Sequence, residues 1–175
     1  SQERGTEDVQ STILVEPMLP VLEDFSRAVE IKTLIFPQDY GPHPDFQTEW
    51  WYYTGNLQSE DGSRFGYQLT FFRRALLPTE HIADRVSSWA TSQVYMAHFA
   101  LSDISSQNFH AFERLSRGAA ELSGAQAQPF QVWLRDWSVT QIGINELGFP
   151  VYKLYAAEAG IELDLFLDDQ KGPIL

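Results

Sequence analysis

The sequence predicts one antiparallel β domain, closed into a barrel of seven, eight or more strands. Apolar and polar residues alternate over several short segments, as in strands that are buried on one face. Turn residues separate these segments at regular spacing, which is typical of barrels and sandwiches. Aromatic residues make up 14% of the 175 residues, and they favour strands and line apolar cavities.

The strands are expected in chain order. The clearest alternation is in residues 65–74, where Phe65, Tyr67, Leu69 and Phe71 share one face. Other strands are expected at residues 49–56, 93–103, 109–115, 130–137, 151–157 and 161–167. Asp61-Gly62 predicts the turn of the first hairpin, residues 103–107 a second turn, and Gly160 the turn of a closing hairpin. Residues 119–128 are small and polar, and they are predicted to be a loop.

The chain divides into two parts. Residues 1–30 are expected to form a flexible or irregular segment, in which residues 22–29 have room for about two helical turns. Residues 31–175 are expected to form the barrel domain. At its start, residues 36–46 contain three prolines and one glycine, which predicts a loop that leads into the first strand.

Composition excludes several function classes. The chain has no cysteine, so it has no disulfide, cysteine-bound metal or thiol nucleophile. Its formal net charge is −12 and it lacks a basic stripe, so we expect no nucleic-acid partner. No apolar run approaches the ~20 residues of a membrane helix, so we expect no membrane span.

The densest cluster of aromatic residues surrounds an acid. In a strand, Glu49, Trp51 and Tyr53 point to one face, while Trp50 and Tyr52 point to the other. Both faces are therefore aromatic, which a barrel around a cavity explains better than a sheet with one wet face.

Glu49 is a candidate catalytic acid. Protonation of an alkene carbon needs a strong acid, and a carboxylic acid kept neutral in an apolar pocket meets that need. Aromatic faces would then stabilise the carbocation. The alternative is a structural carboxylate that pairs with Arg73 or Arg74 on the neighbouring strand.

Two histidines are further catalytic candidates. His43 precedes Glu49 and is placed to relay protons or position water; its alternative is a loop residue that hydrogen-bonds the backbone. His98 shares a strand face with Met96 and Ala100, where a histidine is more often a satisfied interior residue than a base. The strand pattern would still let His98 reach the lumen.

Other chemical signatures are missing from the sequence. It has no Gly-x-Ser-x-Gly nucleophile elbow and no phosphate-binding glycine loop. The four histidines show no metal-ligand spacing. We therefore expect no metal site and no cofactor.

Several segments together resemble one protein family. The longest is the run FPQDYGPHPDFQTEWWYYTGNL, residues 36–57. The later segments FGYQLTFFRRAL, YMAHFALSD, FHAFERLSRGA and FQVWLRDWSV follow in the order expected for the family. The chain thus resembles the AttH/CrtC-like family, which groups predicted secreted hydrolases with carotenoid 1,2-hydratases.

The resemblance implies a tandem lipocalin-like (calycin) fold, of which this chain matches the first barrel only. It implies a polyene-like or terpenoid-like apolar ligand, a secreted or periplasmic location, and a second lipocalin-like domain or a homodimer as partner. We expect ligand contacts from Trp50, Trp51, Tyr53, Tyr67, Phe71, Arg73 and Trp133. Three functions stay open: half of a hydratase-like or hydrolase-like enzyme, a non-catalytic carrier, and a structural barrel that docks a second domain.

Overall fold

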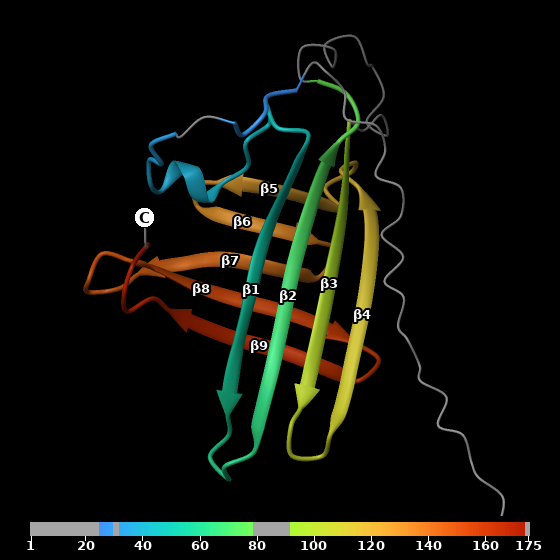
Figure 1. Ribbon diagram of the computed structural model, residues 1–175, viewed down its shortest axis with the longest axis vertical. Coiled ribbons are helices and arrows are strands. Elements are labelled where there is room, and N and C mark those ends of the chain that lie inside the picture. Colours follow the sequence, from blue (N-terminus) through green and yellow to red (C-terminus); the bar gives the residue numbers. More distant parts are fainter. Residues whose placement is uncertain (1–24, 30–31, 79–91, 174–175) are drawn as a thin grey trace, which may run out of the picture.

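The computed structural model describes residues 25–29, 32–78 and 92–173 as two antiparallel sheets and one short 3-10 helix (Figure 1). The first sheet contains β1 (Thr48–Gln58), β2 (Arg64–Ala75), β3 (Gln93–Asp103) and β4 (Asn108–Arg117). The second contains β5 (Ser123–Ala127), β6 (Phe130–Leu134), β7 (Trp137–Ile144), β8 (Pro150–Glu158) and β9 (Ile161–Asp168). The helix η1 (Gln38–Tyr40) precedes β1. No helix in these residues is long and apolar enough to cross a membrane.

Both sheets are simple meanders, in which each strand pairs with the next along the chain. The turn predicted at Asp61-Gly62 joins β1 to β2, and Gly62 adopts a φ of 88° that favours glycine. The turn predicted at residues 103–107 joins β3 to β4. Gly160 lies in the turn between β8 and β9, as the sequence also predicts.

The core lies between the two sheets. In the view of Figure 1, β1–β4 run from top to bottom and β5–β9 run across them. Alternate residues of β2 and β3, such as Leu69, Phe71 and Phe99, face buried residues of the second sheet, such as Val132 and Trp137. Each of these five side chains is fully buried. Period-two alternation therefore encodes the inner face of each sheet.

The predicted antiparallel all-β class is confirmed, with nine strands in the described residues. Within these residues no strand pairing joins one sheet to the other. β1 is an edge strand of the first sheet, and the site described below lies along this edge.

An arginine connects the sheets at the opposite side. Arg114, on the inner face of β4, donates hydrogen bonds to Glu158 Oε2 at 2.8 and 2.9 Å and to the carbonyl of Ala157 at 3.1 Å. It also bonds the carboxylate of Asp136. Its guanidinium carbon lies 4.2 Å from the ring centroid of Trp137. The charge is thus compensated by carboxylates while its flat face packs on the core.

Three predictions of secondary structure are wrong. Residues 123–127 form β5 rather than loop, because pairing with β6 overrides the low strand propensity of small residues. The strand expected at 130–137 is two strands, β6 and β7, separated by Arg135 in the left-handed region at φ 57° and by Asp136. Residues 25–29 are not helical, because Ser26 forms a parallel bridge with Phe46. The rest of the predicted segment 1–30 lies outside the described residues.

The close packing of Trp133 on β5 predicts an effect of Gly124→Ala on stability. A Cβ at Gly124 would lie 2.6 Å from the indole of Trp133, which a hydrogen bond from Nε1 to the Glu121 carbonyl holds in place at 2.9 Å. We expect a loss of about 1–3 kcal/mol in the free energy of unfolding, measured by urea denaturation. Gly66→Ala is the matched control, because its Cβ would meet only the Ser102 Cβ at 3.8 Å. Equal stability of the two variants would contradict this packing.

Candidate functional site

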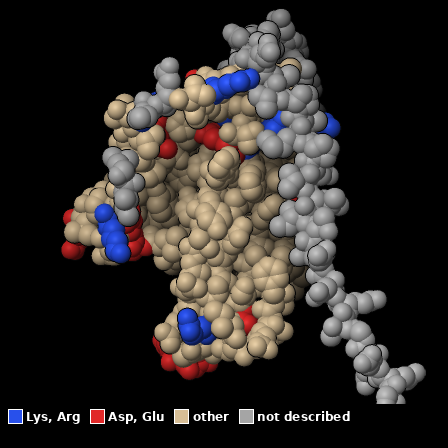
Figure 2. Space-filling model, viewed as in Figure 1, with Lys and Arg blue, Asp and Glu red and all other residues tan. Residues whose placement is uncertain are grey.

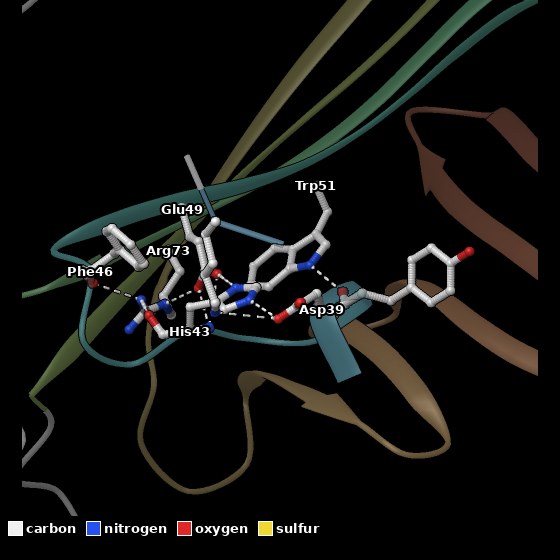
Figure 3. A network of polar contacts seen from close by, with 8 residues as sticks. Asp39, His43, Phe46, Glu49, Trp51 and Arg73 are labelled. Carbon is white, nitrogen blue, oxygen red and sulfur yellow. Dashed lines mark hydrogen bonds and ion pairs between the residues drawn. The ribbon is translucent and has the colours of Figure 1, made fainter. Parts of the chain in front are cut away.

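A cluster of four charged side chains lies where the 36–46 loop meets β1 and β2 (Figure 3). His43 stands between two carboxylates: its Nδ1 lies 2.6 Å from Glu49 Oε1, and its Nε2 lies 2.9 Å from Asp39 Oδ1. Glu49 begins the inner face of β1 and also accepts the backbone N–H of His43 on both oxygens, at 2.8 and 2.9 Å. The loop is thereby tied to the strand that it precedes.

Arg73, on the neighbouring strand β2, completes the cluster. It lies opposite Glu49 in the register of β1 and β2, and its side chain is only 1% exposed. Its Nε donates to Glu49 Oε2 at 3.0 Å, and its Nη2 donates to the carbonyls of His43 and Phe46, both at 2.8 Å. Its Nη1 is buried and has no hydrogen-bond partner in the structure. One guanidinium therefore holds the carboxylate and the loop backbone together.

The electrostatics of the cluster favour a charged histidine. Burial alone lowers the pKa of His43, but the hydrogen bonds and negative charges of Asp39 and Glu49 outweigh it, and the net shift raises the pKa above 6.5. The backbone N–H of Ile35 and the side chain of His43 lower the pKa of Asp39 below 3.8. With both ring nitrogens facing carboxylates, the imidazolium is the form that satisfies all three groups.

The contacts of Glu49 are those of a structural carboxylate. The predicted ion pair with Arg73 is present, and both carboxylate oxygens accept hydrogen bonds from N–H donors. A proton on Glu49 would have to displace one of these donors. His43 likewise has no ring nitrogen directed to open space. The cluster therefore has the contacts of a structural anchor for the loop.

The anchor forms one wall of a cavity of about 430 Å³, which we call the tyrosine cavity. It opens between the edge of β1 and the second sheet. Asp39, His43 and Glu49 lie at its polar end. Apart from Gly41, aromatic residues form the rest of its lining: Tyr40, Trp50, Trp51, Tyr52, Tyr53, Phe130 and Tyr152.

A second cavity of about 510 Å³ adjoins the first, and we call it the proline cavity. Tyr40 lines both cavities. Its ring packs on Phe36 at a centroid distance of 4.5 Å, and its carbonyl accepts the indole N–H of Trp51 at 3.0 Å. No charged side chain lines the proline cavity; its walls are Phe36, Pro37, Pro129, Ile144, Phe149, Pro150 and Pro173, with Gln128, Gln141 and Gly148. Figure 2 shows this face of the molecule hollowed and almost free of charge within the hollow.

The fold places the predicted ligand residues in different parts of the molecule. Trp50, Trp51 and Tyr53 line the tyrosine cavity, although the Trp50 side chain is largely exposed. Tyr67 and Phe71 lie in the packed core between the sheets. Arg73 contacts the site only through Glu49 and the loop.

Two predicted site residues lie elsewhere. The prediction that His98 reaches the lumen is wrong: Ala97 and Phe99 occupy the inner face of β3, so His98 points outward and contacts Glu113 at 3.0 Å. Trp133 is on the outer face of β6 because Val132 and Leu134 are buried within, and its ring covers Gly124 instead of a cavity.

Sequence reasoning missed Asp39, Tyr40, Phe130 and Tyr152. The sequence offers one partial signal, since Tyr152 alternates with the buried Leu154 and Ala156 on β8. Which strand would face Tyr152 could not be read from this pattern. Within the described ranges, no group of three histidine or acidic side chains is arranged to hold a metal ion.

The histidine cluster predicts a pH-dependent contribution to stability. The folded pKa of His43 is raised, so its stabilisation is complete below pH 6.5 and is lost as the pH rises through the folded pKa. The stability gap between the parent chain and His43→Gln should therefore narrow as the pH is raised above 6.5, measured by urea denaturation. NMR titration of His43 should also show that Asp39→Asn lowers its pKa, because one carboxylate partner is lost. An unchanged pKa would contradict the paired geometry.

Removal of the buried guanidinium should destabilise the fold strongly. Arg73→Met leaves Glu49 and two loop carbonyls without their donors, and we expect a loss of about 3–5 kcal/mol. Arg73→Lys keeps the charge but not the forked geometry, so its stability should lie between that of Arg73→Met and that of the parent chain. Thermal and urea unfolding measure the stability of both variants. The neighbouring Arg74→Lys, on the outer face of the same strand, is the control and should change stability by less than about 0.5 kcal/mol. A mild effect of Arg73→Met would disprove the anchoring role.

The comparisons agree with this architecture. The crystal structure of a candidate AttH from Nitrosomonas europaea is similar, with a TM-score of 0.66 and 31% sequence identity over 85% of this chain. The match covers 42% of that protein, so the chain spans less than half of its length. Among curated proteins the comparison finds no match. The AttH-like family matches residues 27–175.

The match to the family thus covers the loop that carries the anchor and both sheets. The predicted lipocalin-like character is confirmed at the level of the fold. The chain belongs to the AttH-like family.

Proposed function

We propose that the chain binds an apolar small molecule whose body occupies the proline cavity and whose polar end passes Tyr40 into the tyrosine cavity. The observation that carries the proposal is the pair of adjoining cavities that share this residue. Sites for small molecules are typically concave and apolar, of about 300–1,000 Å³, with a few polar groups that fix orientation. Each of the two cavities is within this range.

The lining supports an apolar body in the proline cavity. Its walls are proline rings, aromatic rings and Ile144, and no charged side chain is among them. A β-bulge between Gln141 and Gly143 shifts the register of β7 against β8 beside this cavity, and Gln141 and Ile144 contribute to its wall. Burial of apolar surface would supply most of the binding free energy.

The anchor cluster supports binding rather than proton transfer. Asp39, His43, Glu49 and Arg73 direct their hydrogen bonds toward one another and toward the loop backbone. Two carboxylates and two cations then balance in charge, with His43 protonated. The cluster fixes the 36–46 loop, and the loop carries Phe36, Pro37 and Tyr40 into the cavity walls.

A hydrocarbon probe tests this proposal. Isopropenylnaphthalene should bind the full chain, as followed by chemical shifts of backbone amides and of the Trp51 indole in an NMR titration. Ile144→Trp places an indole in the proline cavity and should weaken binding by about tenfold.

Leu115→Trp is the matched control for this experiment. Leu115 is 64% exposed on the outer face of β4, and Ile144 is 67% exposed, so the two substitutions add similar apolar surface at different places. Binding to the Leu115→Trp variant should equal binding to the parent chain. Loss of binding in both variants, or in neither, would count against the cavity as the site.

A further inference from the structure

Two tyrosine side chains from different sheets, Tyr53 and Tyr152, line the tyrosine cavity. Tyr53 projects from the inner face of β1 and Tyr152 from the inner face of β8. Their ring centroids are 6.3 Å apart at an interplanar angle of 63°. Phe130 packs edge-on against Tyr152 at 5.7 Å and fixes its ring. The two phenols therefore face one cavity from two sides.

Neither hydroxyl has a hydrogen-bond partner among the residues that the structure describes. In the same residues, the one fully buried and unpartnered side-chain nitrogen or oxygen is Arg73 Nη1, so both phenol oxygens remain in contact with the cavity. Buried tyrosine hydroxyls usually find a partner in the protein, as Tyr95 does by donating to Gln93 at 2.9 Å. The hydroxyls of Tyr53 and Tyr152 instead keep an accessible oxygen, and both residues line the tyrosine cavity.

Both hydroxyls are held in the neutral form that donates. Burial is the main cause that raises the pKa of Tyr53, and the charge of an ionised Tyr152 adds to it. Burial also raises the pKa of Tyr152. The charges of an ionised Tyr40 and of the Asp169 carboxylate raise it further, by smaller amounts. Asp169 acts on Tyr40 in the same sense. Burial is the first cause for both phenols, and a charged ligand group in the same buried place would pay the same cost of lost hydration.

We infer that Tyr53 and Tyr152 form a clamp across the two sheets that donates hydrogen bonds to a neutral carbonyl oxygen of the ligand. A carbonyl oxygen has two lone pairs and accepts two donors. The inference rests on the proposed function, and it adds that the apolar ligand is a ketone or a related neutral carbonyl compound. An uncharged acceptor fits because the burial of Tyr53 and Tyr152 also disfavours a charged ligand group beside them.

Two probes that differ at one atom test the clamp. Acetylnaphthalene and isopropenylnaphthalene have the same shape, but the first has a carbonyl oxygen where the second has a methylene group. The parent chain should bind the ketone about five to ten times more tightly, as expected for a hydrogen bond that the hydrocarbon cannot make. Carbon-13 at the carbonyl should shift downfield in the bound state.

Tyr53→Phe and Tyr152→Phe remove one hydroxyl each and keep the ring. Each should reduce the preference for the ketone and the carbonyl shift, while binding of the hydrocarbon stays unchanged. Since neither hydroxyl bonds the described protein, both variants should be as stable as the parent chain in thermal unfolding. Tyr155→Phe, on the outer face of β8, is the control and should leave the preference intact.

The outcomes separate the two proposals. Equal binding of both probes by the parent chain, with sensitivity to Ile144→Trp, would overturn the clamp and leave the cavity as an apolar site. A ketone preference that survives both tyrosine substitutions would also overturn the clamp. Failure of both probes to bind would reject the proposed function and the clamp together.

Discussion

The buried guanidinium of Arg73 is the interaction on which the site depends. A charge that is 1% exposed needs compensation, and Arg73 is compensated through Nε and Nη2 by one carboxylate and two loop carbonyls. The carboxylate is Glu49, which in turn holds His43, and His43 holds Asp39. This chain of contacts gives the 36–46 loop a fixed position over the open side between the sheets. Without it, Tyr40 and Phe36 would have no defined place, and the two cavities would lose their shared wall.

The two sides of the molecule differ in the contacts that join the two sheets. On the side of β4, Arg114 reaches the second sheet, where it bonds Asp136 and Glu158 and packs on Trp137. On the side of β1, aromatic residues approach the second sheet without a comparable bond, and Tyr53 meets Tyr152 edge-on. The polar link closes one side, whereas the aromatic side leaves space that a small molecule can occupy. The proposed binding function rests on this asymmetry of the fold.

The contacts of Glu49 bear on any chemistry at this site. An acid that is to protonate a carbon must be neutral and directed at the substrate. Glu49, however, accepts hydrogen bonds on both oxygens. Both ring nitrogens of His43 contact carboxylates. The same contacts suit a rigid support for recognition, in which polar groups satisfy one another and only the phenols remain open to a ligand. The match covers 42% of the similar Nitrosomonas europaea protein.

The sequence by itself determined the antiparallel all-β class, the main hairpin turns and the alternating residue sets of β2 and β3, because alternation and turn residues act locally. As one of two interpretations it also offered an ion pair of Glu49 with Arg73 or Arg74 on the neighbouring strand, and the register of β1 and β2 selects Arg73. Tertiary structure decided that β5 is a strand, that His98 faces outward, and that Trp133 covers Gly124. Only the tertiary structure showed that Asp39 contacts His43 and that Tyr152 packs against Tyr53. These contacts join segments far apart in the chain or within an irregular loop, and their geometry depends on how the two sheets cross, which no local pattern encodes.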